Sequence, residues 1–257
     1  MKVPGVPARV LIRADARLES RELRIGEIMK SVAIITARGG SKRIPRKNIK
    51  EFCGKPILAY SIEAAIKSGM FDRVMVSTDD EEIAETARRY GGEVPFFRSE
   101  KTAGDYATTN DVLLEVLEEY EKRGEHFDLG CCIYPTAPFV TAKKLTDAVK
   151  QLLDSDADTL IPVVRFSYPP QRAMVVRDGR LVFGHPEYLD SRSQDLEPHY
   201  HDVGQFYIFR TENFKRNRKL MVGNILPLVV PETEIQDIDT LTDWEIAEIK
   251  YRRLTEG

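Results

Sequence analysis

Residues 37–48 read ARGGSKRIPRKN, and this stretch decides how the rest of the chain is interpreted. It follows a short apolar run, Val32–Ile35, typical of a buried β-strand, and it precedes a helix whose start is marked by Pro56. Two glycines and a serine let the backbone turn tightly and present N–H groups. Five cationic side chains share the loop: Arg38, Lys42, Arg43, Arg46 and Lys47. A glycine-rich, strongly basic turn between a strand and a helix favours a polyphosphate site over an ordinary solvated loop.

The composition is that of a globular protein and gives no sign of a nucleic-acid or membrane partner. Of 257 residues, 42% are hydrophobic and 31% are charged, and the net charge is −3, so the basic loop is a local site. No apolar run approaches the roughly 20 residues that span a membrane. Cys53, Cys131 and Cys132 lack the spacing of metal ligands, and we expect reduced thiols in a cytoplasmic protein.

Residues 1–28 differ from the rest of the chain. They mix prolines and charges without the apolar segment of a secretory signal, and Met29 stands directly before the first predicted strand. We expect residues 1–28 to be a disordered extension or the product of a start codon assigned too far upstream. Residues 29–257 are expected to form a single domain.

Short apolar strands alternate with amphipathic helices along most of the chain. The expected strands are Val32–Ile35, Val74–Ser77, Glu93–Phe97, Leu129–Ile133, Thr159–Val164 and Ile225–Val230. The expected helices are Pro56–Lys67, Glu81–Tyr90, one capped by Thr109 or Asn110 that runs to Arg123, one capped by Thr141 that runs to Leu153, and Thr242–Arg253. This alternation predicts an α/β fold with a mostly parallel sheet covered on both faces. Ligands of such sheets bind at the carboxyl ends of the strands, where the basic loop is predicted to lie.

The alternation breaks between Arg165 and Arg210. Two strand-like runs, Ala173–Val176 and Leu181–Phe183, flank Asp178-Gly179, which is a hairpin signal. A polar stretch and the apolar run Phe206–Phe209 follow. We expect residues 165–210 to be a small antiparallel β insertion that projects from the sheet.

Asp237-Ile238-Asp239 is a candidate metal site. Two carboxylates at positions i and i+2 point the same way in extended structure, and hard oxygen ligands suit Mg²⁺, which also binds substrate phosphates. Alone, the pair is better explained as a helix-capping acidic loop. With a polyphosphate loop elsewhere in the chain, the Mg²⁺ site becomes the better interpretation.

The stretch Arg192–Asp202 is dense in hydrogen-bonding groups, and Gln205 and Tyr207 follow it. Such a polar set with aromatic backing is typical of sugar recognition, although the composition alone favours a polar surface loop. Tyr134-Pro135-Thr136 closes a strand at the predicted ligand edge and also fits a simple turn.

These motifs resemble the CMP-sialic acid synthetase, or acylneuraminate cytidylyltransferase, family from Met29 to the end of the chain. The basic loop resembles its nucleotide-binding motif, and Asp237 and Asp239 stand where the family places its Mg²⁺ ligands. Arg98 and Thr109 match nucleotide-contacting positions, although on chemistry alone they fit a surface charge and a helix cap. The resemblance therefore assigns ten residues to the nucleotide: Ala37, Arg38, Gly39, Gly40, Ser41, Lys42, Lys47, Asn48, Arg98 and Thr109.

Within the family, the chain is most similar to the pseudaminic acid branch. The similarity lies in CCIYPTAP (Cys131–Pro138), FSYPPQRA (Phe166–Ala173) and RSQDLEPHYHDVGQFY (Arg192–Tyr207). Sialic acid members have Gln-Pro-Thr where this chain has Tyr134-Pro135-Thr136, so a sugar contact by that glutamine does not transfer. The residues expected to contact the sugar are Gln171, Arg192, Gln194, Asp195, His199, Tyr200, Gln205 and Tyr207.

The resemblance implies a Rossmann-like fold, a homodimer whose sites are completed by the insertion of the other chain, and a reaction between CTP and an acidic nine-carbon sugar. Lys42, Arg38, Lys47 and Asp237 are the expected catalytic residues, with Lys42 closest to the developing charge. The alternatives are another acidic sugar (N-acetylneuraminate, legionaminate or Kdo), a transferase that uses another nucleotide and a sugar phosphate, and a nucleotide-binding regulator without catalysis.

Overall fold

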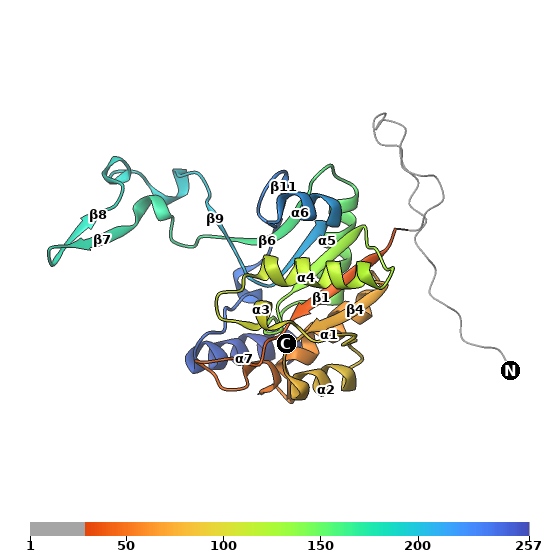
Figure 1. Cartoon of the computed structure of the whole chain (residues 1–257). Coiled ribbons are helices and arrows are strands. Elements are labelled where there is room, and N and C mark those ends of the chain that lie inside the picture. The colour runs from red at the N-terminus through yellow and green to blue at the C-terminus, as the bar shows by residue number, and fades with distance from the viewer. Residues whose placement is uncertain (1–28, 257) are drawn as a thin grey trace.

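The computed structural model describes residues 29–256, and the prediction for residues 1–28 lies outside this part of the chain. Its centre is a seven-stranded sheet in the order β11-β6-β10-β5-β1-β4, with β9 also paired to β6 (Figure 1). The strands are β1 (Ser31–Thr36), β4 (Arg73–Ser77), β5 (Leu129–Ile133), β6 (Thr159–Arg165), β9 (Tyr200–Asp202), β10 (Phe206–Arg210) and β11 (Ile225–Val229). Strand β1 pairs in parallel with β4 and β5, and β6 pairs in parallel with β11. Strands β9 and β10 run antiparallel to the strands that they pair with. The mostly parallel sheet is therefore confirmed.

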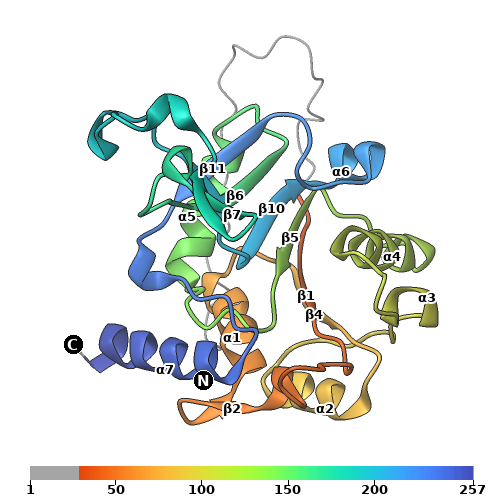
Figure 2. The ribbon, with the colours of Figure 1, turned by 90° about the vertical axis from the view of Figure 1, so that its left-hand side faces the viewer.

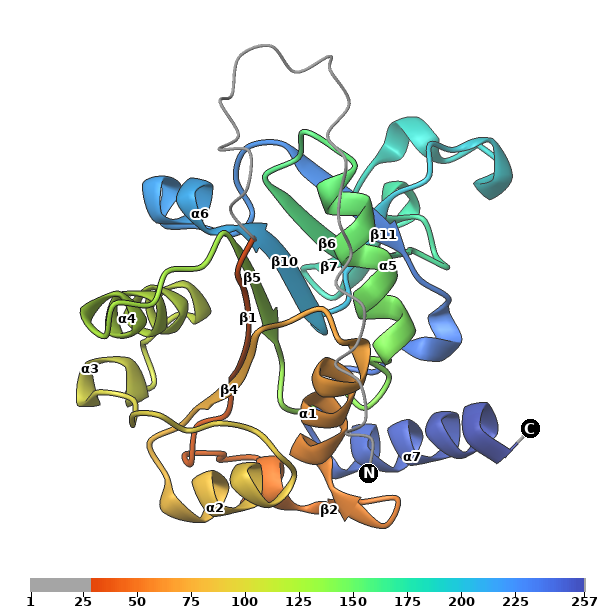
Figure 3. The same cartoon turned by 90° about the vertical axis from the view of Figure 1, so that its right-hand side faces the viewer.

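Helices cover both faces of this sheet, as Figures 2 and 3 show. One face carries α1 (Ile57–Ser68), α2 (Glu81–Arg89) and α5 (Ala142–Leu153), whose apolar side chains pack against β1 and β5. The other face carries α4 (Thr109–Lys122) and α6 (Thr211–Asn217). The remaining elements are η1 (Lys47–Ile49), β2 (Glu51–Phe52), β3 (Lys55–Pro56), α3 (Glu100–Ala103), η5 (Glu232–Glu234) and α7 (Leu241–Glu256). None of the helices in residues 29–256 combines the length and apolar content of a membrane crossing.

Local capping explains most of the helix boundaries. Asp80 caps α2 by accepting a hydrogen bond from the Ile83 N–H at 3.0 Å, and Thr141 caps α5 as expected. The cap of α4 is Thr108, one residue before the predicted pair, because it forms a capping box with Asp111.

One predicted strand is wrong. Within the expected run Glu93–Phe97, the structure has only an isolated bridge between Met75 and Glu93. Pro95 follows two residues later, and a proline cannot donate a backbone hydrogen bond to a sheet.

A long arm leaves the sheet after β6 and returns at β9 (Figure 1). It carries η2 (Pro170–Arg172), the hairpin β7 (Met174–Arg177) and β8 (Arg180–Phe183), η3 (Pro186–Tyr188) and η4 (Ser193–Asp195). The hairpin forms a separate two-stranded sheet, as the sequence predicts. The expected extent to residue 210 differs from the structure, because β10 lies between β5 and β6 in the central sheet and its first four residues are buried. The projecting part therefore ends before Phe206.

Candidate active site

The carboxyl ends of the parallel strands gather five segments at one edge of the sheet. The basic loop follows β1, Thr78–Asp80 follows β4, and Tyr134 follows β5. Residues 202–205 lead into the antiparallel β10, so they lie at the same edge, and residues 230–239 follow β11. The structure thus places the predicted nucleotide loop and the predicted metal ligands at the edge where α/β sheets bind ligands.

The basic loop is shaped by contacts to its own backbone and to the end of β4. The Ala37 N–H donates to the Ser77 carbonyl at 3.0 Å, and the Gly39 N–H donates to Asp79 Oδ1 at 2.9 Å. Asn48 is buried, and its Nδ2 donates to the Arg38 carbonyl at 2.8 Å. Asn48 therefore fixes the conformation of the loop through its side chain.

Two of the predicted catalytic cations converge on one carboxylate. Arg38 Nη1 lies 3.1 Å from Asp105 Oδ1, and Lys42 Nζ lies 2.5 Å from Asp105 Oδ2. The hydrogen bond from Lys42 holds the pKa of the Asp105 carboxyl below its ordinary value. Two cations that share one carboxylate are close enough together to share one phosphate group. Nothing in the pattern around Gly104-Asp105 links it to the basic loop, so the sequence did not reveal this residue.

The other cations of the loop have different partners. Arg46 adopts a left-handed backbone conformation with φ of 55° and forms two hydrogen bonds with Asp80, at 2.5 and 2.9 Å, and an ion pair with Glu82. Arg43 Nη2 lies 2.7 Å from Asp239 Oδ1. Arg46 thus holds the loop against the start of α2, and Arg43 reaches the predicted metal site.

Lys47 connects the basic loop to the two aspartates. Its Nζ donates to the Ile238 carbonyl at 2.6 Å and lies 3.8 Å from Asp239 Oδ1. Burial lowers the pKa of Lys47, while the carboxylates of Asp239 and Asp237 oppose this shift. The Ile238 side chain is buried in an apolar cluster with Trp244. The structure therefore brings the sequence-distant Lys47, Asp237 and Asp239 together.

The donor set at this point fits Mg²⁺ that is shared with a substrate. Among the described residues, no three His, Cys, Asp or Glu side chains form a group that could hold a metal by themselves. Asp237 and Asp239 offer carboxylate oxygens, and Mg²⁺ is commonly held by one or two carboxylates together with phosphates and waters.

Arg98 is a buried residue, so the surface-charge alternative does not hold. Its Nε donates to Ser77 Oγ at 3.1 Å and its Nη2 donates to the Ser77 carbonyl at 2.8 Å, beside the basic loop. Burial lowers the pKa of its guanidinium. Thr109 Oγ1 lies 3.4 Å from the Tyr134 hydroxyl, so Thr109 also faces the sheet edge.

The predicted sugar residues fall into three groups. Gln205 and Tyr207 lie at the sheet edge, where Tyr207 donates to Asp202 Oδ2 at 2.5 Å and packs edge-on against Tyr134. His199 and Tyr200 lie at the root of the arm, at the start of β9. The others lie on the arm itself: Gln171, Arg192, Gln194 and Asp195. One chain therefore does not bring all eight residues together. Asp202, which the sequence places in the polar stretch without a role of its own, is the hydrogen-bond partner of Tyr207.

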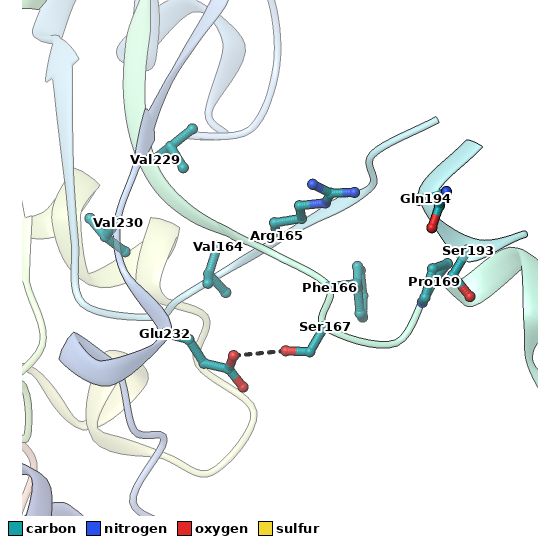
Figure 4. Close-up of a pocket in the computed structure, with 10 residues that line it drawn as sticks. All are labelled: Val164, Arg165, Phe166, Ser167, Pro169, Ser193, Gln194, Val229, Val230 and Glu232. Carbon is teal, nitrogen blue, oxygen red and sulfur yellow. Dashed lines mark hydrogen bonds between the residues drawn. The ribbon is translucent and has the colours of Figure 1, made fainter. Parts of the chain in front are cut away.

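A hollow of about 470 Å³ lies at the root of the arm, as Figure 4 shows. Its lining includes Arg165, Phe166, Gln194 and Glu232, and the Ser167 hydroxyl donates to Glu232 at 2.8 Å. No residue of the basic loop lines this hollow. The hollow is therefore a feature of the arm and β11, apart from the predicted phosphate site.

Comparison with known proteins agrees with this arrangement. Residues 32–225 match the sequence model of a family described as "Cytidylyltransferase". The chain belongs to the cytidylyltransferase family. The match covers the basic loop, the arm and the central sheet except β11 of this cytidylyltransferase, and it confirms that the chain is a nucleotidyltransferase enzyme.

Individual relatives are similar over nearly the whole cytidylyltransferase domain. A pseudaminic acid cytidylyltransferase of Campylobacter jejuni is 40% identical over 225 residues, which cover 87% of this chain and 97% of the relative. A CMP-N,N'-diacetyllegionaminic acid synthase of Legionella pneumophila is 32% identical, covering 86% and 95%. The structure of a CMP:2-keto-3-deoxy-manno-octonic acid synthetase complexed with CTP has a TM-score of 0.64 at 19% identity, covering 89% of this chain and all of that one, and shows a shared fold.

The two glycines of the loop provide a matched pair of variants. A Cβ atom on Gly39 would lie 2.9 Å from Asp80 Oδ2, and Asp80 cannot yield easily because Arg46 and the Ile83 N–H hold it. A Cβ on Gly40 would meet nothing within 4 Å. We expect Gly39→Ala to raise the Kd for CTP about tenfold because it displaces the loop, and Gly40→Ala, which does not press on Asp80, to raise the Kd less. Isothermal titration calorimetry would measure both, and equal Kd values would contradict the close approach.

Burial of Lys47 predicts an alkaline limit to CTP capture. Its pKa is lowered, so the cationic form that binds phosphate is present below that pKa and is lost as the pH rises through it. We expect kcat/KM for CTP, which reports the free enzyme, to fall at a pH below the ordinary pKa of lysine. In Lys47→Arg, this fall in kcat/KM should move to higher pH, because arginine remains charged. If the fall in kcat/KM occurs at the same pH in Lys47→Arg as in the wild type, another group is responsible for it.

Proposed function

We propose that this cytidylyltransferase transfers CMP from CTP to the anomeric hydroxyl of pseudaminic acid and releases pyrophosphate. The observation that carries this proposal is the meeting of Lys47 with Asp237 and Asp239 at the edge that also presents Arg38 and Lys42. A cationic cradle beside two carboxylates suits a nucleoside triphosphate bound with Mg²⁺. The choice of sugar is supported by the 40% identity to a pseudaminic acid cytidylyltransferase over 97% of its length.

In the proposed reaction, the oxygen of the sugar hydroxyl forms a bond to the α-phosphorus and its proton is released to water. At the same time the bond from that phosphorus to the pyrophosphate oxygen breaks, and pyrophosphate leaves with the electron pair of that bond. Arg38, Lys42 and Lys47 hold the triphosphate and balance the charge that develops on the leaving pyrophosphate. Asp237 and Asp239 would hold Mg²⁺, which when bound neutralises charge on the phosphate oxygens. No enzyme side chain becomes covalently attached, so positioning and charge supply the rate enhancement.

The side chains at the end of β5, next to the basic loop, support a sugar other than N-acetylneuraminate. Tyr134 follows β5, at the position where sialic acid members have glutamine. Its hydroxyl lies near Thr109, and its ring packs against Tyr207. Burial raises the pKa of Tyr207, so the phenol stays protonated and can keep donating to Asp202. This set of half-buried Tyr134 and buried Tyr207 differs in shape and hydrogen bonding from a glutamine at the position of Tyr134.

We infer further that the arm completes the site of a second copy of the chain. Met174, Val176 and Leu181 of the β7–β8 hairpin are each more than half exposed, and an isolated two-stranded hairpin has little stability of its own. Packing this hairpin on another copy would bury these side chains. It would also carry Gln171, Arg192, Gln194 and Asp195 to a site that their own chain does not reach. The proposed compartment is the cytoplasm, where the thiols of Cys131 and Cys132 stay reduced.

The test is pyrophosphate release from CTP and Mg²⁺, with pseudaminic acid and N-acetylneuraminic acid assayed side by side. Release with pseudaminic acid alone is the expected result. Release with N-acetylneuraminic acid alone would keep the reaction and discard the proposed sugar. Release with neither leads next to legionaminic acid, because the Legionella relative is named for that product. CTP binding without release for any acidic sugar would favour a regulator without catalysis.

A further inference from the structure

The segment that carries Asp237 and Asp239 has little secondary structure of its own. After η5 (Glu232–Glu234), residues 235–239 belong to no helix or strand. Backbone polar groups that are not paired within a helix or sheet need partners elsewhere. The position of the two carboxylates therefore depends on what holds this segment from outside.

Three side chains from separate parts of the fold hold residues 234–236, which lead into the two aspartates. The aspartates' own end of the segment is held by Lys47, which donates to the Ile238 carbonyl, and by Asp243, which accepts from the Asp239 N–H at 3.1 Å. Gln205, directly before β10, donates from Nε2 to the Glu234 carbonyl at 2.7 Å. Lys144 of α5 lies 2.6 Å from Glu234 Oε2 and also donates to the Phe139 carbonyl at 2.9 Å. Lys250 of α7 donates to the Ile235 carbonyl at 2.8 Å and to Gln236 Oε1 at 3.2 Å. Residues 234–236, directly before the aspartates, are thus tied to the start of β10, to α5 and to α7.

These contacts are sheltered from water, so they are stronger than ordinary surface contacts. Gln205 is 3% exposed, and the side chains of Lys144 and Glu234 are 15% and 29% exposed. The amide nitrogen of Gln205 is committed to Glu234, while the Gln205 carbonyl accepts from the Tyr134 N–H at 2.9 Å. Gln205 therefore links the end of β5, through its backbone carbonyl, to the segment with the aspartates, through its side-chain nitrogen. Its side-chain Oε1 is buried without a hydrogen-bond partner among the described residues, so the predicted sugar contact stays open to it.

We propose that Gln205, Lys144 and Lys250 are positioning residues that place Asp237 and Asp239 for the Mg²⁺–CTP complex. This inference rests on the proposed use of CTP and Mg²⁺. Side chains that bind a metal need support from neighbouring groups, and removal of such a group lowers metal affinity about 10- to 100-fold. None of the three needs to touch the nucleotide to have this effect.

The experiment measures the Kd for CTP by calorimetry in the absence of sugar, once with Mg²⁺ and once with EDTA. We expect the wild-type protein to bind CTP more tightly with Mg²⁺. For Lys144→Met, Lys250→Met and Gln205→Met, the Kd with EDTA should be unchanged and the Kd with Mg²⁺ should rise about tenfold. Lys143→Met and Gln151→Met are matched controls, because both residues are exposed, and Lys143 pairs only with Asp147 of its own helix in the described contacts. Both controls should behave as the wild type.

The outcomes separate this inference from the proposed function. If the wild type responds to Mg²⁺ and the three variants respond equally, the positioning role is wrong and the proposed function stands. If the variants lose CTP affinity equally with and without Mg²⁺, they act through charge or folding, and the positioning role is again wrong. If wild-type CTP affinity is independent of Mg²⁺, both this inference and the metal assignment fail. Thermal unfolding of each variant establishes that it is folded.

Discussion

Lys42→Ala is expected to lower kcat about 10²- to 10³-fold while shifting Tm by less than about 2 °C. The Lys42 side chain is 75% exposed, and its ion-pair partner Asp105 is half exposed, so little folding stability depends on the pair. Its ammonium group stands beside Arg38 at the proposed phosphate site, where charge develops as pyrophosphate leaves. We therefore expect a large loss of turnover with almost no loss of thermal stability.

The measurement is steady-state pyrophosphate release together with a thermal melt. Lys143→Ala is the control, because Lys143 is 84% exposed and pairs with Asp147 at the same 2.5 Å, away from the sheet edge. It should leave both kcat and Tm unchanged. Near-normal turnover of Lys42→Ala would remove Lys42 from the catalytic set.

Lys42→Ala and Arg192→Ala are each expected to be nearly inactive, whereas a mixed dimer of the two should recover about half of the wild-type activity. Lys42 belongs to the body of the molecule, and Arg192 belongs to the arm, which projects away from the body (Figure 1). If each site combines the body of one chain with the arm of the other, one site of the mixed dimer has both residues intact. The mixed dimer can be isolated after coexpression with two different affinity tags.

A second mixed dimer shows whether recovery has this cause. Lys42→Ala combined with Lys47→Met places both defects in the body, so each site keeps one defect and no activity should return. Absence of recovery in the Lys42→Ala and Arg192→Ala pair, with a dimer present, would mean that each chain uses its own arm. A monomer would remove the arm from the site altogether.

The sequence predicted the fold well where local signals were sufficient. The run Leu129–Ile133 and the helix capped by Thr141 have the expected bounds, because apolar runs and caps are local features. Phe206–Arg210 has an equally clear strand pattern, but the pattern does not specify which sheet the strand joins. Its pairing with β5 and β6 is set by partners more than 40 residues away in the sequence.

The sequence predicted which residues form the candidate site better than it predicted the contacts between them. The basic loop and the Asp237–Asp239 pair follow from composition and spacing, and the structure places them together. The engagement of Asp105 with Lys42, and of Gln205 with Glu234, depends on distant segments that only the folded chain brings close. A polar residue in a sequence shows what it can bond to, and only the fold shows which partner it has.

The two ends of the arm meet where they leave the body. Arg165 pairs with Tyr200 between β6 and β9, and the Phe166 N–H donates to the His199 carbonyl at 2.9 Å. Residues 166–199 therefore form a closed excursion that begins and ends at one point. A change in the length or sequence of this segment therefore leaves every strand pairing of the central sheet in place. Under the proposed function, residues 166–199 are the part of the chain in which sugar preference changes without any change to the segments that bind the nucleotide.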